Sequence, residues 1–350
     1  MKNVFVHLGK LKADYLWENI KYLKKIAPQE EIILIIDNKI HLNKYDSQVC
    51  KIFCYSASDV SSKSLDSLQH NIEFRNGFWR SSIERFFALQ QWHRLHPDES
   101  FLHIESDNLV LPNFPWEKFK KVNSLAWLQH NDKYDCAALL YSPNLKSTNW
   151  LIDQIINQIE LDKSLTDMRV LSLISQQYSS KVELLPSYNS NWITKELELN
   201  SKAKVSNSFE KFGGIFDPAA IGVWLTGNDP RNSFGWIKRY KNHFNPLVDP
   251  SVFSFSISNG VVNLSQHGIS SQLFNLHIHS KQKLLFGKFN KILLKFYIYS
   301  SQKQKFPRFY SFVSAYHIAK DLCKIHKFNL INVFKGIYTL FRTRHTELFN

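Results

Sequence analysis

The feature that most constrains the fold is an unbroken apolar run, residues 32–36, which ends at Asp37. Short runs of this kind are typical of parallel strands that are buried on both faces of a sheet. Residues 4–8 have the composition of another strand, and residues 13–27 between the two runs carry apolar side chains at helical spacing. A strand, a helix and a second strand in this order form a βαβ unit. The sequence therefore predicts an α/β fold.

Further elements follow from the same patterns along the chain. Apolar or alternating runs predict strands near 49–55, 101–104, 125–129, 135–141 and 182–185, and a hairpin of residues 252–258 and 260–264. Amphipathic spacing predicts one helix that opens near residue 77, a second at 149–160, and a third that begins after Thr166 as its N-cap.

The strand near 101–104 runs directly into two acidic residues, Glu105 and Asp107. Because side chains alternate in an extended segment, residues two apart point to the same side and both carboxylates can face one point. Converging oxygen ligands suit Mg²⁺ or Mn²⁺, which also bind substrate phosphates. Ligands of open α/β sheets bind at the carboxyl ends of the strands, where this pair falls. The alternative is a loop with two solvated acids.

Three other polar residues are candidates because of their positions. Asp37, at the end of its strand, could bond a base or a ribose, or could be a plain strand-end acid. Arg85 lies on the helix that precedes the acidic pair and could contact a phosphate, although packing is the main role of that helix. Asp167 could favour the positive end of the helix after Thr166, or could face an acceptor hydroxyl.

The stretch 213–232 is rich in Gly, Pro, Asp and Asn but has small apolar residues at its centre. This composition predicts a packed loop with a helical turn, in which the backbone closely approaches another part of the molecule. Asp217 and Asp229 could line a polar pocket there, or could cap short helices.

A His-x-His pair, His277 and His279, precedes Lys281 at the end of a predicted strand. Such a pair is commonly a packed or polar edge. Together with the acidic pair it becomes a candidate third metal ligand, and Lys281 becomes a candidate phosphate contact.

Residues 281–350 carry most of the positive charge. They hold 14 of the 44 Lys and Arg residues and two of the 30 Asp and Glu residues, so their net charge is +12 in a chain of net charge +14. Several segments there have an aromatic face and a lysine face, as expected of amphipathic helices. Such helices can pack on the body, bind an anionic membrane surface, or contact nucleic acid. No nucleic-acid-reading motif accompanies them, so we favour the membrane over nucleic acid.

The remaining composition bounds the setting of the protein. The four cysteines, Cys50, Cys54, Cys136 and Cys323, form no Cys-x-x-Cys pair and no zinc spacing, so reduced thiols are expected. We see neither the apolar core of a signal peptide nor a run of about 18 apolar residues. We therefore expect a cytoplasmic protein, soluble or peripheral at the inner face of a membrane.

These features together resemble the GT-A glycosyltransferases, which take sugars from nucleoside diphosphates. Glu105 and Asp107 look like the Asp-x-Asp motif of that family with Glu in first place, and His279 or His277 with Lys281 looks like its late histidine. Residues 216–222 and 229–232 are similar to a signature of uncharacterised bacterial and phage proteins of this type. The resemblance covers residues 1–281, a catalytic domain, and leaves 282–350 as a basic helical C-terminal extension without a counterpart.

The resemblance implies a mixed, mostly parallel sheet flanked by helices and a metal-assisted transfer of a sugar from a nucleotide sugar to a glycan or lipid-linked acceptor, as in the synthesis of bacterial polysaccharides. It also implies roles for individual residues: Asp107, Glu105 and His279 for Mn²⁺ or Mg²⁺, Lys281 and Arg85 for the donor phosphates, Asp37 for the nucleoside, and Asp167, Asp217 or Asp229 as the catalytic base. Two alternatives remain: a metal-dependent phosphotransferase or nuclease whose basic tail grips nucleic acid, and a non-catalytic protein that binds nucleotide sugars.

Overall fold

A computed structural model describes the body of the chain. The described residues are 1–9, 14–37, 48–57, 65, 78–131, 133–192, 208–227, 250–281, 283–287 and 294.

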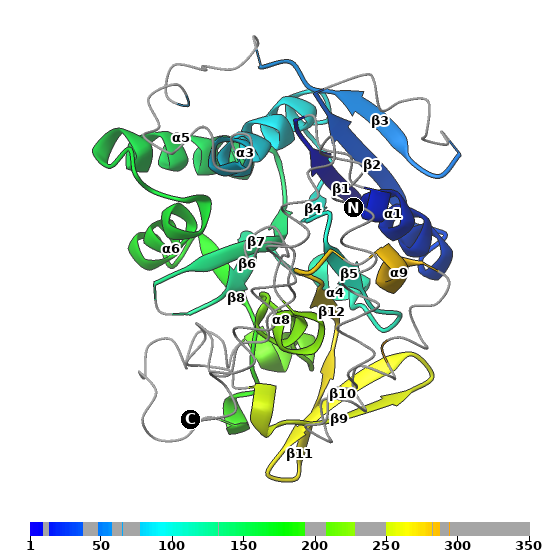
Figure 1. Cartoon of the computed structure of the whole chain (residues 1–350). Coiled ribbons are helices and arrows are strands. Elements are labelled where there is room, and N and C mark those ends of the chain that lie inside the picture. The colour runs from blue at the N-terminus through cyan, green and yellow to red at the C-terminus, as the bar shows by residue number, and fades with distance from the viewer. Residues whose placement is uncertain are drawn as a thin grey trace, which may run out of the picture.

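A seven-stranded sheet forms the centre of the molecule, with the strand order β3-β2-β1-β4-β7-β6-β8 (Figure 1). Its strands are β1 (Lys2–His7), β2 (Glu31–Ile36), β3 (Lys51–Cys54), β4 (Phe101–Ile104), β6 (Leu125–Gln129), β7 (Asp135–Ser142) and β8 (Val182–Leu185). The pairs β1–β2, β1–β4, β2–β3 and β6–β8 are parallel, whereas β7 runs antiparallel to both β4 and β6. The mixed, mostly parallel sheet that we expected is confirmed.

Helices cover both faces of this sheet and enclose two hydrophobic cores. The helices are α1 (Asp14–Ile26), α3 (Phe78–Arg94), α4 (Trp116–Phe119), α5 (Leu145–Leu161), α6 (Asp167–Gln177), α8 (Ala220–Thr226) and α9 (Lys283–Phe286), with short 3-10 turns at Ser190–Trp192 and Pro250–Val252. Helices α3, α5 and α6 contribute to one core, and α1 and α4 contribute to the other.

Strand β2 shows why the apolar run predicts this architecture. Its side chains alternate between the two cores: Ile33 and Ile35 join the core of α3, while Ile32, Leu34 and Ile36 join the core of α1. A strand that buries both of its faces must be apolar at every position. The continuous run 32–36 is therefore a direct consequence of helices on both sides.

Two smaller sheets complete the described body. Strands β9 (Ser254–Ser258), β10 (Val261–Gln266) and β11 (Ile269–Leu273) form an antiparallel sheet, drawn in yellow at the bottom of Figure 1. The predicted turn at Asn259 and Gly260 is confirmed, and both residues have positive φ angles of 52° and 83°. Strand β12 (Asn275–His277) then pairs with β5 (Asn108–Val110), so the chain after β11 returns to the acidic pair.

The described part of the C-terminal region packs on the body. Leu285, Phe286 and Leu294 are buried, and the ring of Phe286 lies 5.7 Å from that of Tyr15 in α1. The predicted amphipathic helices beyond α9 lie outside the described residues. None of the helices in the described ranges is long and apolar enough to cross a membrane.

A buried histidine at the centre of the sheet makes the fold sensitive to acid. The Nδ1–H of His103 in β4 donates to the Val4 carbonyl at 3.0 Å. Burial, together with the positive charge of Arg85, lowers the pKa of His103 from its ordinary 6.5 to about 4. The unfolded chain therefore takes up a proton as the pH falls through 6.5, whereas the folded protein takes it up only near pH 4.

We expect His103→Asn to weaken the loss of stability in this pH interval. The asparagine amide can still donate to Val4 but cannot titrate, so the slope of the free energy of unfolding against pH should fall by up to about 1.4 kcal/mol per pH unit. Urea denaturation at several pH values between 4 and 6.5 measures the slope. His267→Asn, at an exposed turn, is the matched control and should leave it unchanged. Equal slopes for wild type and His103→Asn would contradict the neutral buried state.

Candidate active site

Glu105, Ser106 and Asp107 form the turn between β4 and β5. The Glu105 N–H donates to the Ala138 carbonyl of β7 at 3.0 Å, so Glu105 continues the pairing of β4. From α1, the Asn19 side-chain amide donates to the Ser106 carbonyl at 3.1 Å. The acidic pair therefore lies at the carboxyl end of the central strand, where we expected it, and it is held from both sides.

Strand β12 brings an imidazole to this pair. The Ile278 N–H donates to the Asp107 carbonyl at 2.8 Å, which fixes the end of β12 against the acidic turn. Nε2 of His277 lies 3.3 Å from Oδ1 of Asp107 and 3.5 Å from Oε2 of Glu105. One nitrogen therefore faces both carboxylates.

Two permanent cations hold the other oxygens of the acidic pair. The Arg85 guanidinium pairs with Oε1 of Glu105 and also with Oδ2 of Asp167, and the Lys281 ammonium pairs with Oδ2 of Asp107. Each carboxylate of the pair thus uses one oxygen for a cation and turns the other toward His277.

The charges shift the pKa values of this cluster strongly. Burial alone would lower the pKa of His277, but the carboxylates of Asp107 and Glu105 outweigh burial and raise it well above the ordinary value. Burial would raise the pKa of Asp107, but Lys281 and His277 hold it well below its ordinary value. Arg85 and His277 likewise lower the pKa of Glu105 against the effect of burial. The two carboxylates therefore favour the protonated form of His277 in the metal-free protein.

The donor atoms suit a divalent cation. Oδ1 of Asp107 and Oε2 of Glu105 both approach Nε2 of His277, and carboxylate oxygens with one imidazole nitrogen are ordinary ligands of Mn²⁺, Fe²⁺ and Zn²⁺. The proton on Nε2 lies where such an ion would lie. Binding of the ion would therefore displace that proton. Arg85 and Lys281 would remain as outer-shell partners that orient the carboxylates.

The structure corrects which histidine approaches the acids. We expected His279, but β12 ends at His277 and the chain then turns, since the His279 N–H donates to the His277 carbonyl at 2.9 Å. The two rings are 5.9 Å apart and nearly perpendicular. His277 is thus the histidine that could serve as the third ligand.

Asp217 is a structural carboxylate. It is fully buried and accepts four backbone N–H groups, those of Ala219, Ile221, Gly222 and His277, at 2.7–3.0 Å. These bonds cap the first turn of α8 and tie it to β12, so neither oxygen is left for an acceptor hydroxyl. Of the two interpretations that the sequence left open for Asp217, these bonds favour the capping interpretation over a role as the base.

The predicted close approach of the backbone in this stretch is confirmed. Gly222 packs directly on β12, where a Cβ atom would lie 1.9 Å from the His277 carbonyl oxygen. Only glycine allows α8 to approach β12 so closely. The second acid of the stretch, Asp229, lies outside the described residues.

The other predicted site residues lie at the same edge or beside the pair. Asp37 follows β2, is exposed, and accepts the Gly9 N–H at 2.8 Å. Asp167, in the first turn of α6, is buried against Arg85, and burial raises its pKa although Arg85 opposes this. The predicted N-cap Thr166 is confirmed, because its side chain accepts the Arg169 N–H.

Sequence reasoning missed the buried polar residues that build the site. Asn275 donates to Oδ1 of Asn108 at 2.8 Å and accepts the Asp217 N–H at 2.9 Å, which joins β12, β5 and the loop before α8. His130, after β6, lies near His277, and burial with the charge of His277 lowers its pKa to about 4. Cys136 of β7 also borders the cluster. The only signal in the sequence was the position of Asn108 directly after the acidic pair.

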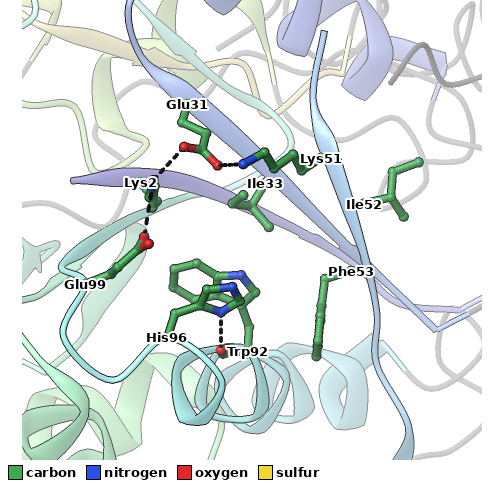
Figure 2. A pocket seen from close by; sticks show the side chains of 9 residues that line it. All are labelled: Lys2, Glu31, Ile33, Lys51, Ile52, Phe53, Trp92, His96 and Glu99. Carbon is green, nitrogen blue, oxygen red and sulfur yellow. Dashed lines mark hydrogen bonds and ion pairs between the residues drawn. The ribbon is translucent and has the colours of Figure 1, made fainter. Parts of the chain in front are cut away.

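A separate small cavity of about 200 Å³ lies at the opposite edge of the sheet (Figure 2). Lys2, Glu31 and Lys51, the first residues of β1, β2 and β3, border it, and His96 stacks on Trp92 at 4.7 Å. Its charges are already paired: Glu31 lies 2.5 Å from Lys2 and 2.6 Å from Lys51. The acidic cluster therefore remains the candidate active site.

Comparisons with known proteins give remote similarities of structure only. No protein-family model and no curated protein matches the chain. The galactosyltransferase LgtC, solved with donor and acceptor sugar analogs, is 14% identical with a TM-score of 0.43 over 59% of this chain and 83% of that chain. The bifunctional glycosyltransferase WbbM is 12% identical (TM-score 0.36; 60% of this chain, 44% of that one), and GlyE of Streptococcus pneumoniae TIGR4 is 13% identical (0.34; 55% and 48%). At TM-scores below 0.5 these likenesses assign no activity to this chain.

We expect Asp217→Asn to destabilise the protein by about 2–4 kcal/mol, because buried N–H groups of α8 and β12 would lose their acceptor and face an amino group. Urea denaturation of the metal-free protein measures the change. Asp162→Asn is the matched control: this exposed aspartate also accepts a backbone N–H, that of Ser164, and its replacement should cost much less. A stable Asp217→Asn protein would contradict the structural role and return Asp217 to the candidate bases.

Proposed function

We propose that the protein is a glycosyltransferase that uses a nucleoside-diphosphate sugar and a divalent metal ion. One observation carries the proposal: at the carboxyl end of the central strand, Glu105 and Asp107 each give one oxygen to a fixed cation and turn the other toward His277. This arrangement combines a metal site with permanent positive charges, which is the combination that stabilises a departing diphosphate.

Each residue then has a chemical task in the transfer. Asp107, Glu105 and His277 would hold the metal ion, and the ion would supply positive charge to stabilise a departing diphosphate. Lys281 adds a fixed positive charge beside Asp107 and can exchange that carboxylate for a phosphate oxygen. Arg85 keeps Glu105 ionised and oriented. Asp37, exposed after β2, contacts the nucleoside.

Two acids remain as candidates for the catalytic base that accepts the proton of the acceptor hydroxyl. Asp167 is the candidate base among the residues that the structure describes. It lies beside Arg85, and its raised pKa suits a group that accepts a proton. Asp229 is the second candidate.

The acceptor in this proposal is a glycan, free or lipid-linked. Residues 250–280 contain no Asp, Glu, Lys or Arg. On β9–β11 the face opposite the core carries Ser254, Ser256, Asn263 and Gln272. These neutral hydroxyl and amide groups match the hydrogen bonds that sugar hydroxyls offer.

We expect the protein to bind one nucleoside diphosphate selectively and only with metal. Thermal unfolding should be measured with UDP, GDP, CDP and CMP, with and without Mn²⁺; ligand at about 100 times its Kd adds about 2.7 kcal/mol of stability. Asp107→Asn should lose the shift, whereas Asp153→Asn, on the exposed side of α5, should keep it.

Release of nucleotide from the matching sugar donor then separates an enzyme from a binding protein. A shift without turnover would favour a non-catalytic nucleotide-sugar binder. A shift with nucleic acid and with no nucleotide, or a full shift in Asp107→Asn, would overturn the proposal.

A further inference from the structure

We propose that Cys136 is a ligand of the metal site beside Glu105 and His277, and that the site prefers a thiophilic ion, Zn²⁺ or Co²⁺, over Mg²⁺. The inference rests on the metal site of the proposed function but not on sugar transfer. Ligand atoms of Glu105, Cys136 and His277 all lie within 4.8 Å of one another. Sulfur, nitrogen and oxygen ligands thus surround one point.

The pairing of β6 and β7 aims Cys136 at this point. Trp127 pairs with Leu140, but the next residue, Leu128, pairs with Cys136. Residues 137–139 of β7 therefore have no partner in β6 and form a bulge in the β6–β7 pairing. Bulges next to active sites commonly redirect a side chain. Here the bulge brings Cys136, which is also part of the hydrophobic core on the side of α1, close to Glu105 and His277.

The same bulge ties the thiol to the acidic pair. Within it, the Ala138 carbonyl accepts the N–H of Glu105 at 3.0 Å and the side-chain amide of Asn108 at 2.7 Å. The Ala138 N–H donates to Sγ of Cys136 at 3.4 Å. An N–H group directed at sulfur stabilises a thiolate, as outer-shell donors do for bound ligands. The thiol and the acids are therefore positioned by one backbone feature.

The donor set decides which ion is preferred. Mg²⁺ favours oxygen ligands in an octahedral arrangement, whereas Zn²⁺ and Co²⁺ accept a mixture of thiolate, imidazole and carboxylate. Glu105, Cys136 and His277 offer three such ligands, which leaves the fourth position of a tetrahedral Zn²⁺ site open, as in catalytic zinc sites. On binding, the ion would replace one proton on Cys136 and one on His277, and both protons would pass to solvent.

Cobalt spectroscopy of the full chain tests the inference. Co²⁺ bound by a thiolate gives an intense sulfur-to-metal charge-transfer band in the near ultraviolet, whereas Co²⁺ held only by oxygen and nitrogen gives the weaker visible bands alone. We expect both in the wild type. Cys136→Ser should keep the visible bands, lose the charge-transfer band, and bind Co²⁺ on the order of 100-fold more weakly, since even outer-shell losses cost 10–100-fold.

Controls separate Cys136 from the other thiols. Cys50→Ser and Cys54→Ser, at cysteines outside the cluster of Glu105, Cys136 and His277, should retain the charge-transfer band. In wild type alone, X-ray absorption at the cobalt edge should show one sulfur atom bound to Co²⁺, which covers the case that Cys136→Ser does not fold. A large excess of Mg²⁺ should not displace the bound Co²⁺.

Each contrary result has its own meaning. Visible bands without a charge-transfer band in wild type, or an unchanged band in Cys136→Ser, would overturn the role of Cys136 and leave the metal site standing. No cobalt bands at all would overturn the metal site as well. Nucleotide binding, measured separately, would be unaffected if only the role of Cys136 failed. This measurement therefore distinguishes a failure of the Cys136 proposal from a failure of the proposed function.

Discussion

Burial of the Glu105 and Asp107 carboxylates is the constraint on which the site depends. Withdrawing an ionised carboxylate from water costs several kcal/mol unless nearby charges and hydrogen bonds compensate. Arg85, 20 residues before Glu105, and Lys281, 174 residues after Asp107, supply the compensation together with His277. Helix α3 and the segment that follows β12 must therefore both pack against the acidic turn before these two acids can remain charged inside the protein.

Another buried carboxylate, that of Asp217, supports the packing of β12 against the acidic turn. Asp217 collects backbone N–H groups from α8 and from His277, and Gly222 lets α8 lie directly on β12. Asn275 links the same segment to Asn108, next to the acidic pair. The position of the His277 ring is thus set by the backbone of β12, which is itself held by side chains that never face solvent. Asp217 acts on the site through position alone.

The sequence predicted the elements whose signal is local. The apolar run of β2 and the strands β6 and β8 have the expected bounds, and the acidic pair lies at a strand end. The roles that the sequence left open or missed depend on contacts between distant segments. Capping and lining acids have the same local pattern, so Asp217 was ambiguous; His277 and His279 differ only in where β12 stops. Cys136 faces the site because of a bulge set by pairing with β6, which no spacing rule for cysteines detects.

The number of protons released when a metal ion binds determines how the net charge of the acidic site changes. In the metal-free protein the proton on His277 and the ammonium of Lys281 already balance the acidic pair. A divalent ion bound by oxygen and imidazole alone would release one proton, so the site would gain one positive charge, which an anionic diphosphate offsets. With Cys136 as a further ligand, two protons leave and the charge of the site is unchanged. With the proposed thiolate ligand, the site would thus hold a divalent ion without needing the negative charge of a diphosphate to balance it.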